Sequence, residues 1–81
     1  IGADLKDAFC SELEIDEANL EGADLTYANL EGSNLNNSFF LEANLHGTNF
    51  TNANLSDAYL VDANIAKAIT KGANLENTIL Q

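Results

Sequence analysis

The sequence predicts an all-β solenoid of about four coils, in which each coil of about twenty residues has four sides. Three observations lead to this fold class. A five-residue unit repeats along the whole chain, turn-forming residues stand at a fixed place in the unit, and large side chains recur at a spacing of twenty residues.

The five-residue unit is clearest in residues 18–32, which read ANLEG, ADLTY and ANLEG. We call the central apolar residue of each unit its centre, and the centres stand at every fifth position from Leu5 to Leu80. All of them except Cys10 and Thr70 are Leu, Ile or Phe. The residue two positions before the centre is Ala, Ser or Thr in every unit except the one with Leu13. The residue between these two is most often Asn or Asp.

A spacing of five residues suits neither a straight helix nor a straight strand. In an α-helix successive centres would step around every face, and in a strand they would alternate between opposite faces. The centres can share one interior only if the backbone turns once in each unit. Asn, Asp and Gly favour such turns, and Gly22, Gly32, Gly47 and Gly72 all stand two positions after a centre. The repeat therefore predicts a solenoid with short sides and many corners.

The number of sides follows from the units that depart from the repeat. Large apolar residues precede the centre at Phe39, Tyr59 and Ile79, and aliphatic residues follow it at Leu41 and Val61. Both sets are spaced by twenty residues, which is four units. Coils of three or five sides would not align them, so the sequence predicts four sides.

These A(D/N)LXX units, which extend from Ala3 to Gln81, resemble those of the pentapeptide-repeat proteins. The resemblance implies a right-handed quadrilateral β-helix in which the centre and the small residue before it point inward. It implies that the other three positions of each unit face outward. The abundance of the family in cyanobacteria makes a cyanobacterial source an expectation.

Length and composition indicate a single domain over residues 1–81, with 46% hydrophobic residues and no proline. The net charge of −10 disfavours direct binding to nucleic acid or to an anionic membrane. No apolar run is long enough to span a bilayer, and no signal peptide is recognised in this chain. We therefore expect a soluble protein with no targeting segment in this chain and no membrane contact.

No set of residues suggests catalysis or cofactor binding. Cys10 is the single cysteine and stands at an inward centre, where a thiol serves as a small hydrophobic group. His46 follows a centre and is expected to face outward. The acidic residues Glu14, Asp16 and Glu17 are better interpreted as a solvated corner than as a cation site. We predict no enzymatic activity, no catalytic residues, no metal and no cofactor.

One side of the predicted solenoid carries an apolar outer surface, which we call the fourth-side patch. It consists of Phe39, Leu41, Tyr59, Val61 and Ile79. Large apolar side chains on so small a surface are typical of a site where a partner binds. The patch is therefore predicted to bind a protein partner or a second copy of the chain. The alternative is that a flanking segment of a longer protein covers it.

These observations predict a non-catalytic structural or protein-interaction module. The alternative is an acidic mimic of DNA that binds DNA gyrase or another DNA-binding protein, as some pentapeptide-repeat proteins do. The charge favours this alternative, but the acidic residues are concentrated in residues 4–21 and are not spread evenly along the chain.

Overall fold

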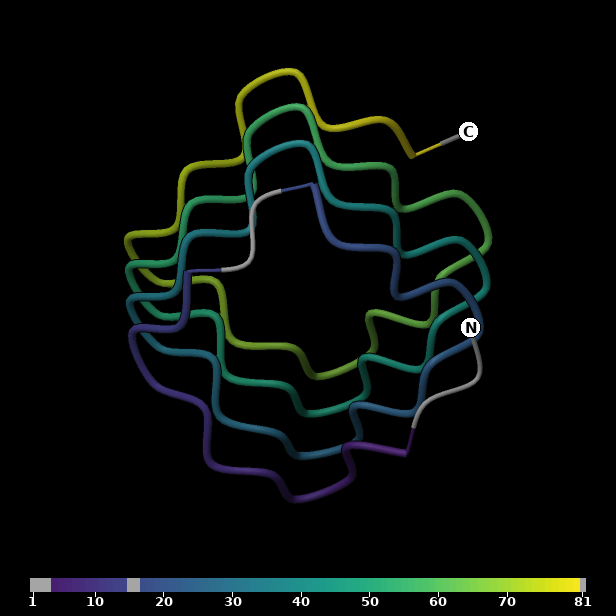
Figure 1. Cartoon of the computed structure of the whole chain (residues 1–81), viewed down its shortest axis with the longest axis vertical. Helices are drawn as coiled ribbons and strands as arrows, with labels where there is room; N and C mark the ends of the chain where they lie inside the picture. The colour runs from purple at the N-terminus through teal and green to yellow at the C-terminus, as the bar shows by residue number, and fades with distance from the viewer. Residues whose placement is uncertain (1–3, 15–16, 81) are drawn as a thin grey trace.

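The computed structural model describes residues 4–14 and 17–80, and in these ranges the chain winds into a stack of coils (Figure 1). Isolated parallel β-bridges hold the coils in register, and each bridge joins two residues twenty positions apart, such as Asp24 with Asn44. The bridging residue is always the one before a centre, from Asp4 to Ile79. The predicted period of twenty residues is thus confirmed. The described residues contain no helix, and their sides are single bridges and not extended strands.

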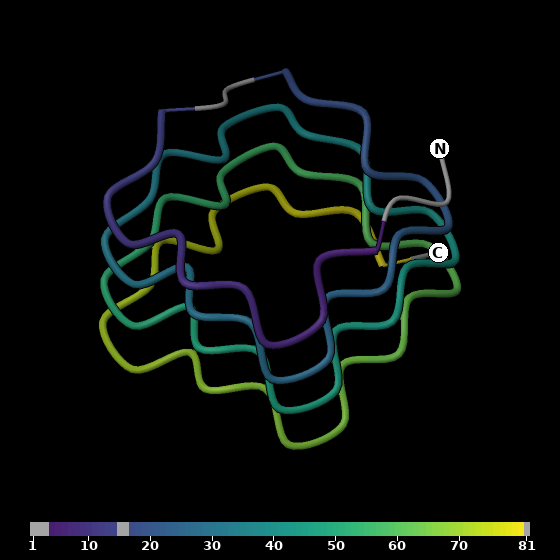
Figure 2. The same ribbon diagram turned by 60° about the horizontal axis from the view of Figure 1, so that its bottom comes forward.

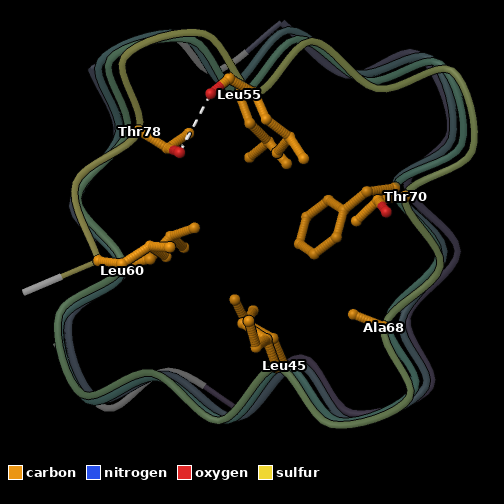
Figure 3. Close-up of a pocket in the computed structure, with 10 residues that line it drawn as sticks. Leu45, Leu55, Leu60, Ala68, Thr70 and Thr78 are labelled. Atoms are coloured by element: carbon orange, nitrogen blue, oxygen red, sulfur yellow. Dashed lines mark hydrogen bonds between the residues drawn. The ribbon is translucent and has the colours of Figure 1, made fainter.

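Coils and sides are named here by their residues. The first coil comprises residues 4–22, of which 15–16 are not described, and the later coils comprise residues 23–42, 43–62 and 63–80. The first and fourth coils form opposite ends of the stack (Figures 1 and 2). Viewed along the stack, the coils superimpose on a nearly square outline (Figure 3). The sides are numbered by their centres in the second coil, which are Leu25, Leu30, Leu35 and Phe40.

The corner of each unit is built by the backbone and by the Asn or Asp side chain. The carbonyl of a centre accepts a hydrogen bond from the N–H three residues later, as between Leu25 and Ala28 at 2.9 Å. The second residue after the centre has a positive φ, for example 61° at Asp7 and 68° at Gly47. The Oδ1 atom of the Asn or Asp before the centre accepts the N–H two residues later, as from Glu31 to Asn29 at 3.0 Å. Asn or Asp at this position therefore supports the turn, although the units with Phe39 and Tyr59 form the same backbone hydrogen bond without it.

The backbone hydrogen bonds between coils have a consistent direction. In the units of the second coil the N–H groups of the centre and of the second residue after it donate to the following coil, as Leu25 does to Asn44 and Tyr27 to His46. The residue before the centre donates to the preceding coil, as Asn29 does to Ala8. Each inner coil is thus bonded on both sides.

The core consists of two sets of inward side chains in the second and third coils, namely the centres and the small residues two positions before them. Every centre and every small residue two positions before it is buried there, which confirms the predicted inward positions. Phe40 and Phe50 pack edge to face, with ring centroids 6.3 Å apart. The buried hydroxyl of Thr48 donates to the carbonyl of Leu25 at 2.7 Å, so the polar group is satisfied inside the core.

The end coils are less well covered than the inner ones, although their residues follow the same repeat. The centres Ile65, Leu75 and Leu80 are exposed, and Leu80 keeps 57% of its accessible surface. No further coil packs on them within the described residues. The molecule measures 26 × 24 × 22 Å along its principal axes, so it is a block of nearly equal dimensions and not the rod that a solenoid suggests.

Leu13 shows what happens when a large residue replaces the small inward one. Its side chain lies at the surface, where it is 38% exposed. Its N–H donates to the hydroxyl oxygen of Ser33 at 3.1 Å, and that hydroxyl donates to the Cys10 carbonyl at 3.0 Å. Ser33 of the next coil thus links the Leu13 N–H to the Cys10 carbonyl. In the other described turns the equivalent N–H and carbonyl bond to each other directly. Cys10 is half-buried and packs against the core, as predicted.

Gly47 is required by a neighbour as well as by its own backbone conformation. A Cβ atom at this position would lie 2.5 Å from ring atoms of Tyr27. We therefore expect Gly47→Ala to lower the free energy of unfolding by more than the about 1–2 kcal/mol that a left-handed conformation costs a residue with a side chain. Thermal or urea unfolding measures the change.

Gly32→Ala is the matched control for that substitution. Gly32 has nearly the same φ, 70°, but its added Cβ would meet only the Glu12 side chain, at 3.3 Å. The excess loss at Gly47 should vanish in the Tyr27→Ala background. Equal losses at the two glycines would contradict the role assigned to the Tyr27 ring.

Candidate functional site

The fourth-side patch is built on one ladder of bridged residues. Phe39 is bridged to Tyr59 and Tyr59 to Ile79, so the ladder places these three residues on successive coils. The rings of Phe39 and Tyr59 stack with centroids 5.1 Å apart and an interplanar angle of 32°. Because the bridging residue is followed by an inward centre, these side chains point away from the core. The predicted alignment of the three residues is confirmed.

The members of the patch differ in exposure. Phe39 and Tyr59 are 40% and 38% exposed, whereas Ile79, Leu41 and Val61 are half-buried. Leu41 and Val61 lie after the centre, on the corner that follows the aromatic ladder. The exposed part of the patch is therefore centred on the two stacked rings.

Acidic residues border the patch at the same corner. Glu42 and Asp62 are exposed, and Glu21 is half-buried. Glu42 and Asp62 stand two residues after the centre in successive coils, and Glu21 stands one residue after its centre, in line with Leu41 and Val61. An apolar centre with a charged rim is the usual anatomy of a protein-binding surface.

A second surface feature, on the corner of the first side, was not predicted from the sequence. The Tyr27 hydroxyl lies 3.3 Å from Nε2 of His46, and the two rings meet edge to face with centroids 5.4 Å apart. Tyr27 stands where the repeat usually has Gly, Asn or Asp, and Gly47 follows it twenty residues later. The contact could have been predicted from the sequence, because a large residue at this position is followed twenty residues later by a glycine. The arrangement packs the Tyr27 ring over the backbone at Gly47.

Charged and metal-binding groups do not form a site in the described part of the chain. In residues 4–14 and 17–80 no group of three or more His, Cys, Asp or Glu side chains is placed to hold a metal ion. The pKa of Asp24 is lowered because its carboxylate accepts hydrogen bonds from the hydroxyl and the N–H of Thr26. This carboxylate shapes a turn, as the asparagines at equivalent positions do. Asp16, one of the three residues of the acidic corner, lies outside the described residues.

The interior of the stack is open at the end of the fourth coil. An apolar hollow of about 260 Å³ lies there, and Figure 3 shows side chains of several sides converging on it. Its innermost lining belongs to the third coil and its rim to the fourth. The lining residues are Leu45, Phe50, Leu55, Leu60, Ile65, Ala68, Thr70, Leu75, Thr78 and Leu80.

The two ends of the stack also differ in charge. The first coil exposes Asp4, Asp7, Glu12, Glu14 and Glu17. Two of the three basic residues of the chain stand in the fourth coil, whose charged residues are Lys67, Lys71 and Glu76. The acidic excess of the chain is therefore concentrated at one end.

Among the described residues, no helix is long and apolar enough to pass through a bilayer.

Comparison with known proteins identifies one family. The family model described as pentapeptide repeats matches residues 1–26 and 23–60. The pentapeptide repeat protein Rfr23 from the cyanobacterium Cyanothece 51142 is 35% identical, with a TM-score of 0.93 over 96% of this chain and 54% of its own. A pentapeptide repeat protein from Nostoc PCC 7120 is also 35% identical, with a TM-score of 0.92 over 99% of this chain and 71% of its own. This chain thus spans about half the length of Rfr23.

HetL from Nostoc PCC 7120 is a more distant structural relative that has a described biological role. It is a pentapeptide repeat protein involved in the regulation of heterocyst differentiation. It is 31% identical, with a TM-score of 0.60 over 99% of this chain and 41% of its own. A search of functionally curated proteins gave no match.

Proposed function

Because the chain belongs to the pentapeptide repeat family, whose members are generally structural or interaction modules, we propose that it is a non-catalytic protein-interaction module. The proposal treats the chain as about four coils of a right-handed quadrilateral β-helix, the fold of its relatives. The rigid coils would hold a binding surface in fixed geometry, which lowers the entropy lost on binding.

The observation that supports this proposal best is the stacked pair of Phe39 and Tyr59 on the outer surface. Aromatic residues near the middle of an apolar patch are typical of the residues that dominate binding energy. The N–H and C=O groups of each of these two residues are hydrogen-bonded to the preceding coil, Phe39 to Ala18 and Leu20 and Tyr59 to Ser38 and Phe40, so the backbone that carries the rings is fixed before binding. The half-buried Leu41, Val61 and Ile79 would extend the contact area.

We propose that the simplest occupant of this surface is the fourth-side patch of a second copy. Two such patches face to face would bury the four rings together and leave the acidic rim in solvent. A partner of another sequence is the alternative occupant. The regulatory role described for HetL is compatible with a module that acts by binding another protein.

Tyr59→Asp is expected to weaken association at least tenfold, because it places a charge in the apolar contact while the buried centres remain unchanged. Sedimentation over a range of concentrations measures this. Asn49→Asp is the control, since it adds the same charge at the equivalent position of the second side. If both variants associate as the wild type does, or if the wild type is monomeric and recovers no partner in a pull-down, the fourth-side patch does not have this role.

The net charge of −10 favours a second candidate function, the mimicry of DNA. The acidic side chains of the first coil would then occupy the phosphate-binding sites of DNA gyrase or another DNA-binding protein. A gyrase supercoiling assay tests this directly. Inhibition that survives Tyr59→Asp would favour mimicry of DNA, whereas a lack of inhibition together with patch-dependent association would favour the interaction module.

A further inference from the structure

The fourth side presents residues of the same chemical class at equivalent positions of the second and third coils. The position before the centre is aromatic in both coils, the position after it is aliphatic, and the next position is acidic. The matched pairs are Phe39 with Tyr59, Leu41 with Val61, and Glu42 with Asp62. Both coils are bridged to a described coil on each side, so this surface belongs to the interior of the stack and not to its ends.

This match makes the surface self-complementary. A two-fold axis that lies in the plane of the fourth side, runs across the stack and passes between the second and third coils exchanges the members of every matched pair. A symmetric dimer uses the same patch on both copies, so each residue would then face a residue of its own class on the second copy. The stacks of the two copies run in opposite directions in this arrangement.

We propose that two copies pair in this antiparallel register, and that the acidic corner which the register brings together limits the strength of their association. The inference rests on the proposed role of the fourth-side patch as an interaction surface. It adds the orientation of the second copy, the residues that face each other and the control of binding by charge.

The aromatic rings favour this register over its neighbours. Phe39 and Tyr59 are 40% and 38% exposed and stack with centroids 5.1 Å apart, so each copy offers two rings to the two rings of the other. Ile79 then faces Asn19 of the second copy, outside the ring contact. A shift by one coil would place Phe39 against Ile79 and leave only Tyr59 facing an aromatic ring. Aromatic pairs contribute more than their buried area alone, which favours the unshifted register.

The acidic residues oppose association in the same register. Glu42 and Asp62 are exposed, and both stand two residues after a centre at the same corner. Glu42 of one copy therefore faces Asp62 of the other, and the two-fold axis repeats this contact. The second and third coils contain no lysine or arginine to offset it. Because exposed charges are screened by salt, the apolar attraction should prevail more fully as ionic strength rises.

Exchange of the corner charges tests the register. We expect Glu42→Lys alone to tighten association by about five- to tenfold at a salt concentration of about 0.01 M, because it turns both like-charge contacts into opposite-charge ones. Asp62→Lys should do the same. The double variant Glu42→Lys/Asp62→Lys restores like charges in both contacts and should return to about the wild-type affinity. An effect of net charge alone would make the double variant the tightest of all. Sedimentation equilibrium measures the four affinities.

The chain offers matched controls for these variants. Lys67 stands at the same position of its unit with a φ of 61°, close to the 58° of Glu42 and 60° of Asp62, so lysine suits this backbone. Glu31→Lys makes the same change of net charge on the second side, opposite the patch, and should alter affinity little. Asp57 borders the other edge of the patch and would face Asp62 only if the stacks were parallel. Asp57→Lys should therefore not tighten association.

The proposed register is overturned if the double variant associates more tightly than either single variant, or if Asp57→Lys tightens association while Glu42→Lys does not. It is also overturned if Glu42→Lys and Asp62→Lys behave as Glu31→Lys does, the result that a shift by one coil would give. If neither the wild type nor Glu42→Lys associates, pairing of two copies is excluded. Tyr59→Asp separates these failures from failure of the proposed function. Loss in Tyr59→Asp of self-association, or of a partner recovered by pull-down, would keep the patch as the interaction surface, whereas no loss would overturn both.

Discussion

Phe40→Ala should lower the free energy of unfolding by about 3–5 kcal/mol, the range observed when a fully buried aromatic ring is removed. Phe40 has no exposed surface and packs edge to face against Phe50 of the next coil. The stacked backbone cannot close the space left by the ring without breaking hydrogen bonds between coils. Urea unfolding followed by circular dichroism measures the change.

Phe39→Ala is the matched control, because it removes the same side chain from the adjacent residue. Phe39 faces outward and is 40% exposed, so the expected loss is only about 1 kcal/mol, mainly from its stacking on Tyr59. Similar losses at the two positions would contradict the inward and outward assignments.

Leu35→Asp is expected to prevent folding or to cost at least about 4 kcal/mol, which approaches the whole stability of a small domain. Leu35 has no exposed surface, and Leu55, which follows it in the third-side ladder, is also buried. A carboxylate there would lose its hydration and find no positive partner. The proportion of folded protein by circular dichroism at neutral pH measures the effect.

Asn34→Asp adds the same charge one residue earlier and serves as the control. The Asn34 side chain accepts the N–H of Asn36 at 3.2 Å and the amide of Asn54 at 3.4 Å, and a carboxylate can accept both. The expected change in the free energy of unfolding is within about 1 kcal/mol, because the new charge stays hydrogen-bonded at the outer surface. A large loss for Asn34→Asp would show that this side does not tolerate a carboxylate even at its outer surface. The cost of Leu35→Asp could then not be attributed to burial.

The repeat predicted the architecture closely because one local rule applies to nearly every unit. A buried centre, a small inward neighbour and an Asn or Asp turn residue predicted the residues of the core. The spacing of the coils came instead from the units that depart from this rule, because Phe39, Tyr59 and Ile79 recur every twenty residues. Whether this ladder binds a partner remains a prediction, since exposure identifies a surface but not its occupant.

The structure departs from the prediction where the environment of a residue depends on the neighbouring coils. Leu80 and Ile65 have the same type of residue at the centre as the inner coils, but they are exposed because they stand at the end of the stack. Leu13 is too large for the small inward position, and its turn depends on Ser33 of another coil. The contact of Tyr27 with Gly47 likewise joins residues that the five-residue pattern treats separately.

The direction of the hydrogen bonds between coils gives the molecule an electric dipole. In each unit two N–H groups point toward the C-terminal end and one points away, so their contributions do not cancel as they do in a flat sheet. The C-terminal end is thus the positive pole, the reverse of an α-helix. The lysines of the fourth coil and the acids of the first enlarge this dipole. Two molecules paired side by side through Phe39 and Tyr59 should therefore lie antiparallel, because parallel dipoles placed side by side repel.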